Sequence, residues 1–214
     1  MRGVTRMRRP RLVFAGLCIL ALVPVAGGSI RLAAIAGWIP LQPDAATNGA
    51  PPVALVTHII AANLFCLIGA WQVTLAPRQA HRWAGHALLC LGTVAVVAGL
   101  AAIVNTPIRP ADGPLVNVLR WVVALGWLGT LWLGARAAWQ RDFARHGIWM
   151  AYALAFAFGA GSTILVAIPV ELVFGETSGV LYDLTLNGGY VLNLIVVTLI
   201  LRRRAARRQV PVWS

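Results

Sequence analysis

The stretch Arg78-Gln79-Ala80-His81-Arg82-Trp83-Ala84-Gly85-His86-Ala87-Leu88-Leu89-Cys90 separates two long apolar runs and carries two of the four histidines of the chain. Glycines then recur at every seventh position, at Gly85, Gly92 and Gly99. Seven residues are nearly two turns of an α-helix, so these glycines lie on one face and leave it narrow. The stretch therefore predicts a short hydrophilic turn at 78–82 followed by a membrane-spanning helix.

The composition also favours a membrane protein. The chain of 214 residues is 59% hydrophobic and only 11% charged, which leaves too few polar side chains to cover a soluble fold. A spanning helix needs about 20 apolar residues, and six such runs account for nearly the whole chain. We expect an all-α integral membrane protein, a six-helix bundle in one transmembrane domain (12–201) between a basic N-terminus (1–11) and a basic tail (202–214). The expected spans are 12–30, 53–75, 83–104, 119–138, 147–170 and 184–201.

The 18 basic residues, all arginines, set the orientation predicted for these spans. Fifteen of them fall at the chain ends and in the turns at 78–82 and 136–145, whereas Arg31, Arg109 and Arg120 fall on the other side. The positive-inside rule then places both termini in the cytoplasm, and we expect a multi-pass protein of the bacterial inner membrane. The expected partner is the lipid bilayer. Despite the net charge of +12, nucleic acid is not expected, because no basic face with interleaved aromatic residues lies outside the apolar runs.

The first apolar run, Leu12 to Ile30, has two interpretations. A basic start and small residues at its end fit a cleavable signal sequence, and Arg8-Arg9 resembles a twin-arginine signal. The run is long for a signal, so a retained helix is favoured. The cysteines predict neither a disulfide nor a zinc site, because all three lie in apolar runs without metal-ligand spacing.

Three histidines, His81, His86 and His146, fall near the predicted inner face. Two neutral imidazoles that face each other across a helix bundle can ligate a haem b iron from both sides. His86 and His146 are the preferred pair, although their predicted depths differ by about 5 to 6 Å at 1.5 Å per residue. His81 with His146 is the alternative pair. The competing interpretation is that these histidines only solvate inner turns and contact lipid phosphates.

Four ionisable residues, His58, Arg120, Glu171 and Asp183, fall near the predicted outer face, as does Asn187. Ionisable groups at membrane depth are costly and are therefore candidates for function. The favoured interpretation is structural, an ion pair of Arg120 with Glu171 or Asp183. The alternative is an outer polar pocket that handles a proton or binds a small ligand.

Signatures of common soluble enzymes are missing from the sequence. There is no His-Glu-x-x-His, no Gly-x-Ser-x-Gly and no phosphate-binding Gly-Lys-Ser/Thr loop. Hydrolase, kinase or protease activity is therefore not expected, and a redox role stays open. No clear inverted repeat with interrupted spans is visible, which gives a secondary transporter only modest support.

Three motifs together resemble a known family. They are Thr57-His58-Ile59, His81-Arg82-Trp83-Ala84-Gly85 and Arg145-His146-Gly147-Ile148-Trp149-Met150-Ala151-Tyr152-Ala153-Leu154. In order and spacing they resemble the bacterial membrane proteins grouped as domain of unknown function 2306, over residues 55–200. In that family basic residues are common where this chain has His86 and Ala151. The family implies no activity.

More distantly, the six-helix plan resembles transmembrane cytochromes b, which hold two haems between histidines of four central helices. This chain has no histidine on the fourth span, so the resemblance implies at most one haem, on the cytoplasmic side. Two hypotheses follow. One is a single-haem electron-transfer component that works with a membrane redox partner or quinone. The other is a non-catalytic assembly component or a small transporter with an outer polar pocket.

Overall fold

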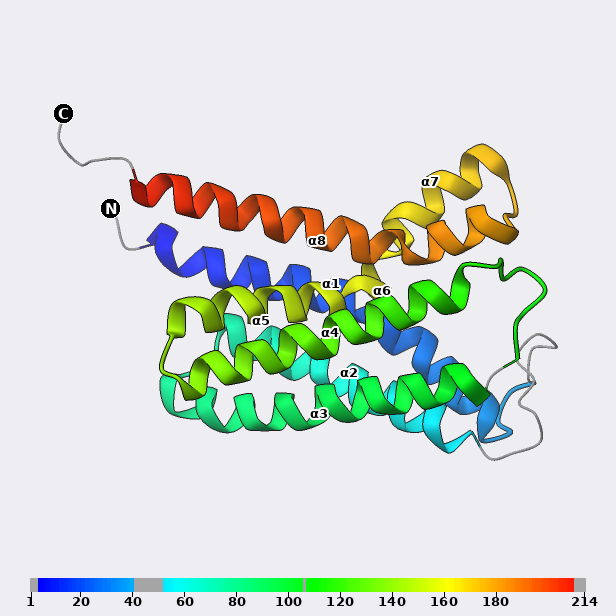
Figure 1. Cartoon of the computed structure of the whole chain (residues 1–214), viewed down its shortest axis with the longest axis horizontal. Helices are drawn as coiled ribbons and strands as arrows, with labels where there is room; N and C mark the ends of the chain where they lie inside the picture. Colours follow the sequence, from blue (N-terminus) through cyan, green and yellow to red (C-terminus); the bar gives the residue numbers. More distant parts are fainter. Residues whose placement is uncertain (1–3, 41–51, 106, 210–214) are drawn as a thin grey trace.

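The long helices of the protein run along one common axis, and their connections gather at two ends (Figure 1). The computed structural model describes residues 4–40, 52–105 and 107–209. Half of the segment 31–52, which its prolines and turn-forming residues predict to be an outer loop, lies outside the described residues. The helices are α1 (Val4–Ile35), α2 (Val53–Thr74), α3 (Arg78–Asn105), α4 (Val116–Trp139), α5 (Phe143–Ala157), α6 (Gly159–Ser162), α7 (Ile164–Phe174) and α8 (Gly179–Gln209).

The predicted all-helical membrane fold is confirmed. Five helices of the described chain are each long and apolar enough to cross a bilayer, and the bent pair formed by α5 and α6–α7 makes a sixth span if it is counted as one. No β-strand occurs in the described ranges; a single β-bridge joins Asp112 to Gly179. Many large apolar side chains point outward from these helices, as expected where the surrounding solvent is lipid.

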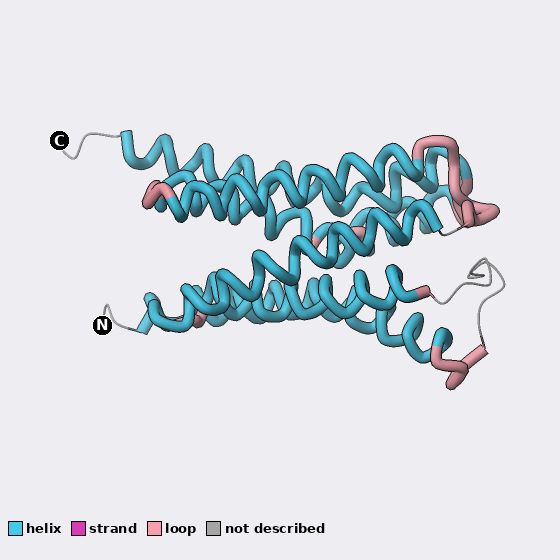
Figure 2. The backbone as a smooth tube through the Cα atoms, turned by 60° about the horizontal axis from the view of Figure 1, so that its bottom comes forward, coloured by secondary structure: helices cyan, strands magenta, loops and turns pink. Residues whose placement is uncertain are grey.

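α1 begins and α8 ends at the same end of the bundle (Figure 1), as an even number of crossings requires. The α2–α3 and α4–α5 turns lie at that end too, which we call the termini end. The opposite end, which we call the loop end, carries the described parts of the connections 36–52 and 106–115 and the connection 175–178, and the tube in Figure 2 shows the same separation. Which end faces the cytoplasm stays a prediction.

Three helices extend beyond the predicted spans. The α2–α3 connection is only 75–77, so Arg78, His81 and Arg82 belong to α3 and not to a loop. α1 continues past Arg31, because a long arginine side chain can reach toward the membrane surface without ending a helix. α8 begins at Gly179, which places Asp183 inside a helix instead of an outer loop.

The fifth span is broken rather than straight. α5 and the α6–α7 segment meet at an angle of 51° around Phe158. The break falls in the glycine-rich sequence that starts at Gly159, where helix propensity is low. Neighbouring polar groups hold it: Asn193 Nδ2 donates to the Ala155 carbonyl at 3.1 Å, and Ser162 Oγ donates to Asn193 Oδ1 at 2.8 Å. The bond from Asn193 gives a partner to a backbone carbonyl at the break, where a membrane offers no water to replace it, and the bond from Ser162 holds the Asn193 side chain in place.

The packed core lies between α2, α3, α4 and α5. Phe65, Leu88 and Leu131 are almost completely buried there, and the Phe65 ring meets the edge of Trp127 with ring centroids 5.2 Å apart. Small residues let the helices approach closely: a Cβ atom at Gly92 would lie 2.6 Å from a methyl carbon of Leu131. Close approach of helix backbones is how membrane helices gain packing energy in lipid. This core forms the floor of the site described next.

Candidate functional site

A cavity of about 740 Å³ lies between the core and the loop end. We call it the loop-end cavity. Side chains from α1, α2, α3, α4, α5, α6 and α8 and from the 106–115 connection line it, and most of them are apolar. The polar side chains that line it are Arg31, His58, Asn63, Arg109, Arg120, Asn187 and Tyr190.

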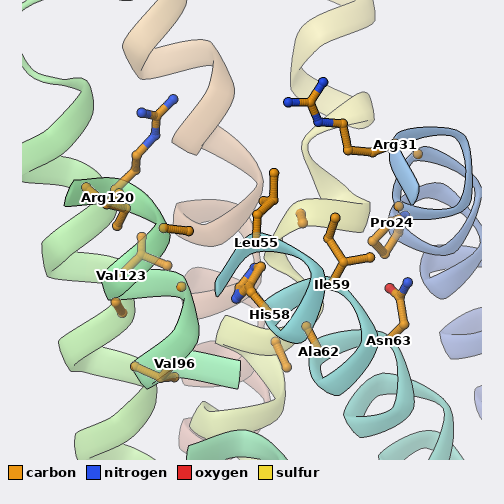
Figure 3. A pocket seen from close by; sticks show the side chains of 18 of the residues that line it. Pro24, Arg31, Leu55, His58, Ile59, Ala62, Asn63, Val96, Arg120 and Val123 are labelled. Carbon is orange, nitrogen blue, oxygen red and sulfur yellow. The ribbon is translucent and has the colours of Figure 1, made fainter. Parts of the chain in front are cut away.

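The charge of the lining is one-sided. Three arginines from α1, α4 and the 106–115 connection line the cavity, whereas no aspartate or glutamate does so among the described residues. Figure 3 shows Arg31 and Arg120 on opposite sides of the cavity with His58 between them. An apolar chamber with guanidinium groups at its rim suits a molecule that combines an apolar body with an acceptor-rich or anionic end.

His58 is held in place by α3. Its Nδ1 lies 2.7 Å from the carbonyl oxygen of Ala95, and a Cβ atom at Gly99 would lie 2.7 Å from the same nitrogen. The glycine face of α3, which the seven-residue spacing predicts, is therefore the surface on which the imidazole rests. A side chain at Gly99 would push His58 from its position.

Arg120 makes its ion pair with a residue that the sequence analysis did not select. Its Nη2 lies 3.3 Å from Oδ2 of Asp112, and its Nη1 lies 3.4 Å from Oδ1 of Asn117. Arg109 binds the same carboxylate more closely, with Nη2 at 2.9 Å and Nε at 3.2 Å from Oδ1. The expected pairing of Arg120 with Glu171 or Asp183 was wrong, because an acid in the adjacent connection lies within its reach.

The two arginines determine the ionisation of Asp112. Burial of the carboxylate acts to raise its pKa, but the hydrogen bonds from Arg109 and the positive charges of Arg109 and Arg120 outweigh it, so the pKa lies below the ordinary value. Asp112 therefore stays charged and joins the 106–115 connection to α4.

Asp183 has a structural role. Its side chain is completely buried, Oδ1 accepts a hydrogen bond from Gly113 N at 2.8 Å, and Oδ2 accepts one from Leu115 N at 2.9 Å. Gly179 N also donates to the Ala111 carbonyl at 3.0 Å. Asp183 thus fastens the 106–115 connection to α8 and does not line the cavity. Glu171 is exposed on α7 and lines neither described cavity, so the loop-end cavity contains His58, Arg120 and Asn187 of the predicted outer group but neither of its acids.

A smaller cavity of about 230 Å³ adjoins the first one between α4, the helix break and α8. Its lining is Arg120, Ala160, Thr163, Leu186, Asn187 and Tyr190, and four of these residues also line the loop-end cavity. Sequence reasoning did not select Tyr190. The spacing of Asp183, Asn187 and Tyr190, four and then three residues, places them on one face of α8 and could have identified it.

The predicted inner histidines do not face one another. His86 is exposed, and its Nδ1 lies 2.8 Å from the carbonyl oxygen of Arg82 in its own helix. It lies two residues from each of the buried positions Ala84 and Leu88, about 200° around the helix from each. It therefore points away from the bundle interior. His146 lies against α4, with its Nδ1 2.9 Å from the carbonyl oxygen of Gly134.

The residues present therefore do not form a bis-histidine haem site in this arrangement. Both axial imidazoles would have to enter one space between helices. His81 is exposed at the start of α3, where its carbonyl oxygen accepts a hydrogen bond from Gln72 Nε2 at 2.9 Å. Across the described chain, no three His, Cys, Asp or Glu side chains gather closely enough to hold a metal ion.

Comparison with known families decides the family of this chain. A family model described as "Predicted membrane protein (DUF2306)" matches residues 55–201, which run from α2 into α8. The chain belongs to this family. The match confirms the resemblance carried by the three sequence motifs, and it covers every helix that lines the two cavities except α1. No curated protein and no solved structure matches the chain.

Proposed function

We propose that this protein binds a membrane-soluble, amphipathic small molecule in the loop-end cavity and carries it to, or presents it at, one face of a bacterial inner membrane. The observation that supports this proposal is the cavity itself. About 740 Å³ lies within the range of small-molecule sites, about 300–1,000 Å³. Such sites are mostly apolar with a few polar groups that fix the ligand, as this lining is.

The break in the fifth span supports a transport or carrier role. Phe156 and Ala157 at the end of α5 and Ala160 in α6 all line the cavity. In secondary transporters, interrupted helices commonly border the substrate site, because unwound backbone there can rearrange. α1 also contributes to the lining through Arg31, so the proposal includes a retained first helix.

The proposal places the loop end on the periplasmic side and both termini in the cytoplasm. The arginine distribution supports this orientation, since fifteen of the eighteen arginines fall at the termini end or in the terminal segments. In this orientation the cavity opens in the outer half of the bilayer. Its ligand would then enter from, or leave toward, the outer leaflet or the periplasm.

A binding measurement tests the proposal. Trp127 lines the cavity, and its indole N–H makes no hydrogen bond within the described chain. A sixteen-carbon amphiphile with bromine on the chain should quench Trp127 by contact when it occupies the cavity. In lipid nanodiscs we expect saturable quenching by brominated hexadecanol or brominated palmitate, and a Trp127→Phe variant identifies the part of the signal that comes from Trp127.

Two matched variants separate cavity binding from dissolution in the lipid. Ala160→Phe fills the cavity from α6, whereas Ala87→Phe adds the same ring to an exposed position of α3 that lines neither cavity. We expect Ala160→Phe to weaken binding at least tenfold and Ala87→Phe to leave it unchanged. Quenching that rises linearly with probe, equally in both variants, would overturn the proposal and favour a non-catalytic assembly component.

The single-haem alternative remains a hypothesis with its own test. It requires α3 to rotate so that His86 enters the bundle opposite His146, and it implies a membrane redox partner or quinone. A reduced-minus-oxidised b-type absorption spectrum from protein made in haem-replete cells, lost in His86→Ala and His146→Ala, would establish it. Colourless protein would exclude it.

A further inference from the structure

We infer that the ligand carries an anionic head group, a carboxylate or phosphate monoester on a single alkyl chain, and that Arg120, Tyr190 and Asn187 hold this head group where the two cavities meet. The inference rests on the proposed function, since it names the ligand class for the same cavity. It also gives the smaller cavity a role, as part of the head-group site, whereas the proposed function concerns the loop-end cavity alone.

The three side chains converge from two helices on one place. Arg120 of α4 and Asn187 and Tyr190 of α8 are lining residues of both cavities. The helix break lies on the remaining side, where Ala160 contributes only a methyl group. A compact head group can therefore be reached by all three polar side chains.

Each of the three side chains has a hydrogen-bond donor left over. The Tyr190 hydroxyl has no hydrogen-bond partner among the described residues. Asn187 uses one amide hydrogen for the Asp183 carbonyl at 2.8 Å, which leaves its second hydrogen. Arg120 has five N–H donors and makes two long contacts with them. A set of donors with no lining carboxylate favours an anion over a cation.

Arg120 can exchange partners at low cost. Its contacts of 3.3 Å to Asp112 and 3.4 Å to Asn117 are at or beyond the long limit for N–H···O hydrogen bonds. Arg109 holds the same carboxylate through its side chain and also through its backbone N–H, at 3.2 Å from Oδ2. Asp112 therefore keeps a charged partner when Arg120 turns to the ligand. A guanidinium group of this kind can bind a carboxylate or phosphate with two parallel hydrogen bonds.

The rest of the loop-end cavity offers an apolar wall along which the alkyl chain of the ligand can lie. From Arg120 the lining continues along α4 through Val123 and Ala124 to Trp127, at intervals of one to three residues along one side of the helix. Val96 of α3 and Cys66 of α2 extend this apolar wall to the core. An alkyl chain placed there contacts Trp127, which is why the brominated probes report on it.

The test compares four brominated sixteen-carbon probes that differ only in their head group: the carboxylate, the phosphate monoester, the alcohol and the amine. At pH 8, we expect both anions to quench Trp127 with at least tenfold higher affinity than the alcohol, and the amine to bind more weakly than the alcohol. The inference is overturned if the alcohol binds as tightly as the anions. If no probe binds saturably, the proposed function itself fails.

Variants locate the head group. We expect Arg120→Gln to lower the affinity for both anions at least tenfold more than the affinity for the alcohol, and an unchanged melting temperature shows that the variant is folded. Tyr190→Phe should lower the preference for anions several-fold, and Arg120→Lys should restore part of it. Arg145→Gln, an exposed arginine at the termini end that pairs with Asp142, is the matched control and should change nothing. Undiminished preference for anions in Arg120→Gln would overturn the assignment.

A competition experiment distinguishes a lipid-borne anion from a free one. If the site is built for an alkyl anion, millimolar inorganic phosphate or acetate should leave binding of the brominated carboxylate unchanged. Displacement by inorganic phosphate alone would show that the site binds free anions, and it would overturn the alkyl part of the inference.

Discussion

At the scale of single residues, Asp183 shows how a buried charge can serve structure rather than chemistry. Both of its oxygens accept backbone N–H groups, from Gly113 and from Leu115. Hydrogen bonds to a charged acceptor are stronger than neutral ones, and a buried donor that loses its acceptor is costly. Asp183 therefore holds the connection that positions Arg109 and Asp112 beside the cavity.

Replacing Asp183 with asparagine should destabilise the protein. Asparagine has the same size, but its amide nitrogen cannot accept the bond from Gly113 or Leu115, so we expect a loss of about 1–3 kcal/mol in the free energy of unfolding. Thermal unfolding in detergent measures it. Asp142→Asn is the control, because asparagine also serves as an N-cap, the role Asp142 has for Arg145 N. Equal effects of the two substitutions would contradict the structural role of Asp183.

Asp112 should make stability depend on pH at the acidic end. Its pKa is depressed in the folded protein, so its contribution is fully present above its ordinary value of 3.8 and is lost as the pH falls through the lower, folded value. We expect the difference in melting temperature between the wild type and Asp112→Asn to be constant from pH 7 to about pH 5 and to shrink below pH 4. A difference that does not change with pH would mean that the Arg109 and Arg120 contacts do not stabilise the charged form.

The sequence identified some of these residues and missed others for physical reasons. His58 and Arg120 were found because charged groups at membrane depth are conspicuous. The prediction for His86 considered how deep the residue lies in the membrane but not which side of the helix it occupies. Ala84, Leu88 and the glycine face define the buried side of α3, and His86 lies on the other side. Asp112 was missed as the partner of Arg120 because the path of the 106–115 connection, which brings the carboxylate to α4, cannot be predicted from the sequence.

At the scale of helices, the fifth span differs most from expectation. The sequence predicts one membrane-spanning helix at 147–170, because this apolar run contains no charged residue. The break depends on polar groups supplied by α8, Asn193 above all, which the local sequence does not show. Gly189 makes room for the displaced chain, because a Cβ atom there would lie 2.6 Å from the carbonyl carbon of Ser162.

The substitution Gly189→Ala should therefore disturb the break. The added methyl group would collide with backbone atoms of Ser162, Thr163 and Gly159, so we expect a loss of about 1–3 kcal/mol in unfolding free energy. Gly147→Ala is the matched control, because nothing lies within 4 Å of its added methyl group. It should be neutral or stabilise the helix by up to about 1 kcal/mol. Equal tolerance of both alanines would show that α8 does not pack against the break as described.

At the scale of the whole molecule, composition and arginine placement were enough to predict a helical membrane bundle with its ends together. The cavity was not predictable in the same way. It depends on side chains from α1, α2, α4 and α8 meeting at one depth, and on α1 lying against α2 and α6. Hydropathy gives the length of each helix but not its rotation or its neighbours.

The orientation of the bundle can be measured with single cysteines in a background without the three native ones. In intact cells, a thiol reagent that does not cross membranes should label Glu176→Cys at the loop end. It should label Gln79→Cys and Phe143→Cys only after the cells are permeabilised, because arginine-rich turns stay in the cytoplasm. The reverse pattern would invert the bundle and place the cavity in the inner half of the membrane.

The central claim is that an alkyl anion occupies the loop-end cavity with its head group at Arg120, and photo-crosslinking tests it most directly. A palmitate analogue with a diazirine next to the carboxylate should attach to α4 and α8 near Arg120, Asn187 and Tyr190, and excess unlabelled palmitate should prevent the reaction. Adducts confined to lipid-facing residues such as Leu172 and Val173 of α7, which are 82% and 73% exposed, would contradict the account.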